Sequence, residues 1–121
     1  MPGRPLFFVG AAREDLRAFS DEARREAGHQ LFRVQLGQMP NDWKPMISVG
    51  RGVYEIRIHT VVEHRVFYIA KYAEAVYVLH VFEKKTQQTR LADIEVGRAR
   101  LKTLERLRNQ SGLARPRRND D

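Results

Sequence analysis

Four basic residues occur where the expected strands would bring them together. Arg57 lies in an alternating segment, and Arg65 opens the apolar segment that follows it. If these segments pair around a turn centred near Val61, Arg57 and Arg65 stand opposite each other, which is unfavourable for like charges. A shared anion would relieve the repulsion, and phosphate is the obvious candidate. Lys84 and Lys85 follow a third strand and are expected to reach the same face, where such cations would stabilise a phosphodiester transition state.

A purely structural interpretation of these residues stays open beside the functional one. Arg57 would then form a surface ion pair with Glu55 or Glu63, and Lys84 and Lys85 would end a strand and protect the sheet edge. Under either interpretation Arg65 is expected to face solvent at the start of its strand. Its replacement by Ala should therefore cost little stability.

The histidines offer weaker candidates for chemistry. His59 and His64 flank the turn, and either is expected to face the cationic surface, with intrinsic pKa values suited to proton transfer. His80 lies inside an apolar strand and is expected to be a hydrogen-bonded core residue. Tyr68 is expected in the core with its hydroxyl at a rim. No spacing of His, Asp and Glu suggests a metal site, and the chain has no Cys.

Several other catalytic classes lack their motifs. The segment Gly50-Arg51-Gly52 is too short for a nucleotide-binding loop and precedes a strand instead of a helix. The serines lie in cap or loop contexts without a paired His, which argues against a serine hydrolase.

Breakers and hydrophobic periodicity predict a small α+β domain that positions these residues. Ser20 is a candidate N-cap, apolar residues then recur with helical spacing, and Gly37 is the expected helix stop. We expect a strand at 6–9, a polar segment at 12–17 that is a possible first helix, a helix at 20–37, a loop at 38–52, strands at 53–59, 65–70 and 76–82, and a helix at about 90–108. The short connections favour a three-strand meander within a mostly antiparallel sheet, with the helices packed on one face. The stripe of the last helix is predicted to comprise Leu91, Ile94, Leu101 and Leu104.

Composition sets the class of protein. The chain has 121 residues, a mass of 14.1 kDa, a formal net charge of +7 and a pI near 10.2. This size predicts one domain, taken as residues 1–110, and residues 111–121 read as a disordered basic tail. No apolar run is long enough to span a bilayer, so we expect a cytoplasmic protein with no membrane contact. The charge favours a nucleic-acid or nucleoprotein partner.

Several ordered motifs resemble one known family. The segments are Asp42-Trp43-Lys44-Pro45-Met46, Gly52-Val53-Tyr54-Glu55-Ile56-Arg57, Arg65-Val66-Phe67-Tyr68 and Val78-Leu79-His80-Val81-Phe82-Glu83-Lys84-Lys85-Thr86-Gln87. Together they resemble the phage-derived, HigB-like branch of the RelE/ParE toxin superfamily, over roughly residues 5 to 107. The resemblance implies a RelE-like fold and the toxin of a type II toxin–antitoxin pair.

The resemblance also implies an activity and a site. Toxins of the RelE and HigB type cleave mRNA in the ribosomal A site without metal or cofactor, through attack of the ribose 2′-hydroxyl on the adjacent phosphate. By motif, Arg57 and Arg65 would hold the scissile phosphate, and Lys84 or Lys85 would stabilise the transition state or leaving group. The residues expected to contact RNA or the ribosome are Arg51, His59, His64 and Arg90.

The chain departs from RelE at two positions. Glu55 stands where RelE has a second lysine, and no Tyr occurs near Thr89-Arg90-Leu91 at the start of the last helix. The general acid and base therefore stay unassigned.

Two other functions compete with mRNA cleavage. One is a ParE-like, non-enzymatic inhibitor of DNA gyrase, and the other is an inactive phage-derived protein that binds nucleic acid. The toxin interpretations imply a cognate antitoxin, of the HigA type with a helix-turn-helix domain, in a toxin–antitoxin hetero-oligomer. The nuclease interpretation adds the ribosome and mRNA as partners.

Overall fold

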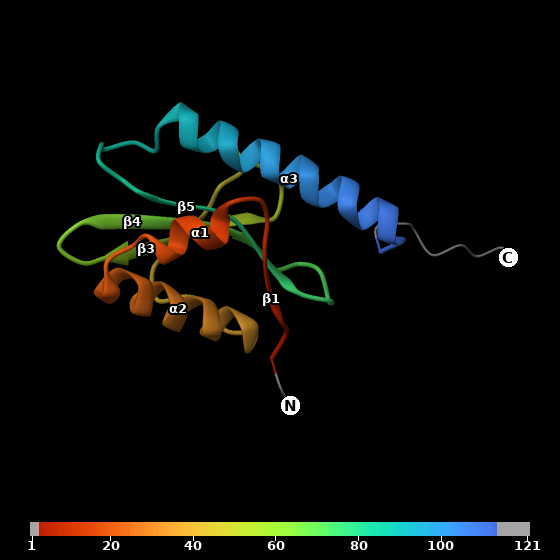
Figure 1. The fold of residues 1–121 in the computed structure, drawn as a ribbon, viewed down its shortest axis with the longest axis horizontal. Helices are drawn as coiled ribbons and strands as arrows, with labels where there is room; N and C mark the ends of the chain where they lie inside the picture. Colours follow the sequence, from red (N-terminus) through yellow and green to blue (C-terminus); the bar gives the residue numbers. More distant parts are fainter. Residues whose placement is uncertain (1–2, 114–121) are drawn as a thin grey trace, which may run out of the picture.

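A five-stranded sheet lies between two layers of helices in the computed structural model, which describes residues 3–113 (Figure 1). The elements in chain order are β1 (Leu6–Phe8), α1 (Ala12–Arg17), α2 (Asp21–Gln35), β2 (Trp43–Pro45), β3 (Val53–His59), β4 (Glu63–Ile69), β5 (Val76–Glu83) and α3 (Leu91–Ser111). The strand order is β1-β5-β4-β3-β2, with β1 parallel to β5 and the other pairs antiparallel.

Each face of the sheet carries its own hydrophobic core. On one face, α1 and α2 pack on the strands through residues such as Ala27, Leu31 and Ile56. On the other face, α3 packs through Leu101 and Leu104. Because alternate residues of a strand point to opposite faces, a short chain can bury both sides of its three central strands.

The second helix forms as the sequence predicts. The Ser20 side chain accepts a hydrogen bond of 3.2 Å from the Ala23 amide, which caps the helix N-terminus. Ala23, Ala27, Leu31 and Val34 are all buried. Gly37 follows the helix with a φ of +86°, a left-handed conformation that favours glycine.

The α+β class and the C-terminal helix are confirmed, and the prediction for the sheet is corrected. The meander of β3, β4 and β5 exists, and the sheet is mostly antiparallel. It has five strands, however, with β1 parallel to β5, and helices cover both faces instead of one. The strand β2 lies inside the segment expected to be a loop, where Trp43 pairs with Ile56. The polar segment after β1 forms the helix α1.

The C-terminal helix is longer than predicted and less regular in its apolar stripe. Leu91 is exposed, whereas Leu101 and Leu104 are buried and Ile94 is partly buried. The helix runs to Ser111, the first residue of the predicted tail, and residues 114–121 of that tail lie outside the described part of the chain. Within residues 3–113, no helix has the length and apolar character that crossing a membrane requires.

Candidate functional site

An open cleft lies where β2, β3, the loop after β5 and the start of α3 meet. We call it the cationic cleft, and its volume is about 470 Å³. It is lined by Lys44, Pro45, Met46, Ile47, Ser48, Arg57, Lys84, Gln87, Gln88, Thr89 and Ile94. Three of these side chains are cations, and none of the lining residues is acidic. A cleft of this composition suits a phosphate group beside a less polar moiety.

The predicted pairing of Arg57 with Arg65 is confirmed. The register of β3 on β4 places the two residues directly opposite each other. Their depths differ, however, because 35% of the Arg57 side chain is exposed and only 7% of the Arg65 side chain. The prediction that Arg65 faces solvent is therefore wrong. Arg65 is more deeply buried than Arg57 and is not among the cleft residues.

Glu55 supplies the anion that the two arginines share. Its side chain is fully buried, and its Oε1 lies 3.6 Å from Arg57 Nε and 3.7 Å from Arg65 Nε. Its Oε2 accepts a hydrogen bond of 3.2 Å from the Thr89 hydroxyl. The ion pair foreseen in the structural interpretation thus exists, but it is internal instead of superficial. Arg65 Nη1 also donates at 2.9 Å to Glu63 Oε1.

Lys84, and not Lys85, lies in the cleft. The Lys84 ammonium donates to the Gln87 carbonyl, which folds the loop after β5 over the end of the sheet. Partial burial, followed by the nearby charges of Arg65, Lys44 and Arg57, lowers the pKa of Lys84, and the charge of Glu55 opposes this shift. Lys85 is 71% exposed and lies 3.8 Å from Glu83.

The three histidines singled out in the sequence, His59, His64 and His80, occupy different environments. The His59 ring forms hydrogen bonds with the carboxylates of Asp42 and Glu63. Both bonds raise the pKa of His59, and the bond to Asp42 has the larger effect. His64 is buried on the face that α1 and α2 cover, with its ring 4.2 Å from that of Phe19, so the structure does not bring it to the cleft.

His80 is a buried residue, as expected. Its Nε2 lies 2.8 Å from Asp93 Oδ1, and burial lowers its pKa. Asp93 belongs to the first turn of α3, so this contact ties the helix to β5.

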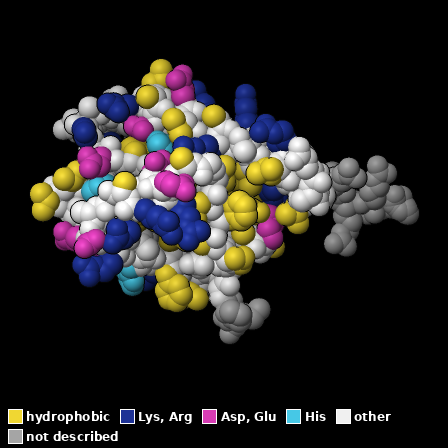
Figure 2. Space-filling view, in the orientation of Figure 1, with side chains coloured by type: hydrophobic (Ala, Val, Ile, Leu, Met, Phe, Trp, Pro, Cys, Tyr) yellow, Lys and Arg dark blue, Asp and Glu magenta, His cyan; other side chains and the backbone are white. Residues whose placement is uncertain are grey.

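The remaining predicted contacts with RNA lie outside the cleft. Arg51 lines a neighbouring cavity, which shares Pro45 and Ile47 with the cationic cleft. Arg90 precedes α3, is 61% exposed and lies 3.8 Å from Asp93. On the face drawn in Figure 2, Lys and Arg side chains are interspersed with Asp and Glu.

Two functional or structural features escaped the sequence analysis. Lys44 is a cleft cation that stands opposite Glu55 in the register of β2 on β3. The signal for it was the apolar Trp43 beside it in a segment otherwise rich in Pro and Gly. The other feature is a clamp between Arg108 and Glu74, with contacts of 2.7 and 3.1 Å, which holds the end of α3 to the turn before β5.

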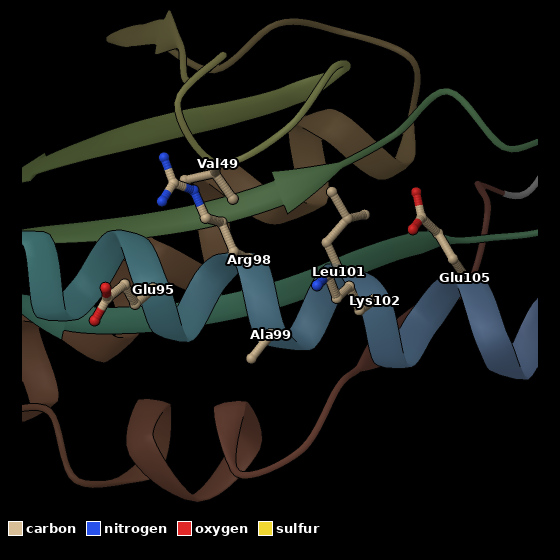
Figure 3. Close-up of a pocket in the computed structure, with 7 residues that line it drawn as sticks. All are labelled: Val49, Glu95, Arg98, Ala99, Leu101, Lys102 and Glu105. Atoms are coloured by element: carbon tan, nitrogen blue, oxygen red, sulfur yellow. The ribbon is translucent and has the colours of Figure 1, made fainter.

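A second cavity, somewhat larger than the cationic cleft, is a poorer candidate. It runs along α3 beside Val49 and has a volume of about 550 Å³. Its charged side chains are Glu95, Arg98, Lys102 and Glu105, which spread along one helix instead of converging (Figure 3). Arg98 is already engaged, since its Nε donates at 2.7 Å to the Ser48 carbonyl. No three His, Asp or Glu side chains gather as a metal site anywhere in residues 3–113.

The sequence matches the model of a known protein family. A family model described as "Phage derived protein Gp49-like (DUF891)" matches residues 14–102, a segment that includes every residue of the cationic cleft. No curated protein matches the chain.

Proposed function

The chain belongs to the Gp49-like family of phage-derived proteins, a RelE-like family, and from this premise we propose that it is a ribosome-dependent mRNA endonuclease. It would be the toxin of a type II toxin–antitoxin pair. The observation that carries the proposal is the convergence of Lys44, Arg57 and Lys84 on one open cleft free of acidic lining residues. A gyrase inhibitor that acts by binding alone has no need of such a phosphate site.

The reaction requires no group beyond the RNA, the protein and water. The ribose 2′-oxygen forms a bond to phosphorus while the bond from phosphorus to the 5′-oxygen breaks, which leaves a 2′,3′-cyclic phosphate and a 5′-hydroxyl. Arg57 and Lys44 would bind the non-bridging oxygens and stabilise the extra charge of the transition state. Lys84 would give its proton to the departing 5′-oxygen, a role favoured by its lowered pKa. The proton of the 2′-hydroxyl passes to water.

The partners follow from this chemistry. The ribosome presents RNA phosphates over a wide surface, and the net charge of +7 suits attraction to it. The protein would then act in the cytoplasm, where ribosomes translate. A cognate antitoxin of the HigA type would hold it inactive in a hetero-oligomer.

A matched pair of lysine variants tests the proposal in a reconstituted translation reaction. The wild-type chain and Lys85→Met should cleave a translated mRNA, while Lys84→Met should lose most of the activity, because Lys84 lines the cleft and Lys85 does not. An mRNA with no start codon should stay intact. Intact translated mRNA together with inhibited gyrase supercoiling would overturn the proposal in favour of the ParE-like function.

A further inference from the structure

The carboxylate between Arg57 and Arg65 is not accessible to solvent. Glu55 is 0% exposed, and its Oε1 has no hydrogen-bond partner among the described residues. The Nε atoms of Arg57 and Arg65, both buried, also lack a hydrogen-bond partner there. A buried ion is costly unless other charges offset it, so this arrangement needs an explanation.

The two carboxylate oxygens of Glu55 have different neighbours. Glu55 Oε1 lies between the two guanidinium groups at 3.6 and 3.7 Å, and Oε2 is held by the Thr89 hydroxyl. The carboxylate thus lies beside the buried Nε of Arg57, while the exposed part of the Arg57 side chain lines the cleft. Arg65, opposite Arg57 on β4, is fixed by donating to Glu63 and to the His64 carbonyl, both at 2.9 Å.

We infer that Glu55 is a positioning residue, which orients the Arg57 guanidinium toward the cationic cleft and offsets the charge of the buried Arg65. Glu55 does not line the cleft, and both of its oxygens face groups of the chain itself, so it does not contact the RNA. The inference rests on the proposed cleavage for its consequence in catalysis, but the positioning of Arg57 is measurable without RNA.

The first test uses the Arg Nε–Hε signals in NMR spectra of the full chain. Arg57→Lys and Arg65→Lys assign the two signals by their loss. In Glu55→Gln the Arg57 signal should move toward the position of a free arginine, because glutamine has the same size but no charge. The other carboxylate beside Arg57, that of Asp42, lies 3.9 Å from Nη1 and would still act on that end of the guanidinium. In Glu55→Asp, which keeps the charge on a shorter side chain, the signal should move only part of the way. The control Glu83→Gln removes an exposed carboxylate at the end of β5 and should leave it in place.

The second test measures cleavage of translated mRNA by the same variants. Displacement of Arg57 should lower the cleavage rate of Glu55→Gln between about tenfold and a hundredfold, the usual effect of a misplaced binding group. Glu55→Asp should regain part of the rate, and Glu83→Gln should match the wild type.

A double variant separates positioning from stability. Glu55→Gln leaves the buried Arg65 with Glu63 as its remaining carboxylate partner, so the urea midpoint should fall. In the double variant, which adds Arg65→Met, the buried charges of Glu55 and Arg65 are both absent, so most of the urea midpoint should be restored. Cleavage should stay low because Glu55 no longer orients Arg57.

Recovery of cleavage in the double variant, or an unmoved Arg57 signal in Glu55→Gln, would overturn the inference. If the wild-type chain cleaves nothing while the Arg57 signal shifts as expected, the proposed function fails and the role of Glu55 in placing Arg57 stands.

Discussion

Replacing the two facing arginines by Met, one at a time, should have different effects. Arg57→Met should mainly lose activity, and Arg65→Met should mainly lose stability. Arg57 and Arg65 occupy paired positions on β3 and β4 and share the Glu55 carboxylate at nearly equal distances. The main difference is depth, since 35% of the Arg57 side chain is exposed against 7% for Arg65. The pair is therefore an internal control for the effect of burial on one type of interaction.

The expected magnitudes follow from that depth. Arg65→Met leaves Glu55 buried with one partner fewer and also removes the 2.9 Å bond to Glu63, so the free energy of unfolding should fall by about 3 kcal/mol or more. Arg57→Met also leaves Glu55 with one partner fewer, but it removes a partly solvated charge and keeps the bond from Arg65 to Glu63, so the loss should be smaller, about 1 kcal/mol. Domains of this size have about 5–15 kcal/mol of stability, so both variants should fold at low temperature.

Urea unfolding followed by circular dichroism measures both values. Cleavage of translated mRNA is measured on the same samples. Arg57→Met should be as well folded as the wild type and unable to cleave, while Arg65→Met should be clearly less stable. Losses of stability that agree within about 1 kcal/mol would refute the reasoning, because burial would then not distinguish the two positions.

Three further predictions concern ionisable groups. The cleavage rate should begin to fall at a lower pH than the ordinary lysine value of 10.5, because Lys84 acts protonated and its pKa is lowered, and a rate flat to that pH would contradict the assignment. The bond from Arg108 holds the pKa of Glu74 at about 2 instead of 4.5, so the Glu74 carboxylate stabilises the fold above pH 4.5 and this contribution disappears as the pH falls toward 2. Glu74→Gln should therefore lower the free energy of unfolding at pH 7 by about 1–2 kcal/mol, and equal urea midpoints for variant and wild type at that pH would exclude the clamp. The NMR titration of His59 should give a pKa above 6.5 that falls in Asp42→Asn, and its stabilising contribution should be present below pH 6.5 and lost as the pH rises through the folded-state pKa.

Local patterns in the sequence predict much of the fold. The spacing of Ala23, Ala27, Leu31 and Val34 and the cap at Ser20 are properties of one segment, and they predict α2 correctly. The β3–β4 register is also local, because a short turn fixes which residues face each other, and it places the two arginines opposite each other as expected.

The features that the sequence did not predict depend on how different segments pack together. The three-residue strand β2 contains Pro45 and gains its order by pairing with β3. The parallel pairing of β1 with β5 joins segments about seventy residues apart, and no local pattern encodes it. The depth of Arg65 follows from the placement of Glu55 and Glu63 around it, which alternation along one strand does not specify.

Mapping of mRNA ends after brief induction of the chain in cells tests the proposed function most directly. Primer extension on an abundant transcript should show breaks inside the translated frame, and removal of its start codon should abolish them. The Arg57→Met variant should produce neither breaks nor growth arrest. Growth arrest by the wild-type chain with intact mRNA would contradict the proposed function, and so would expression of the folded chain without arrest or breaks.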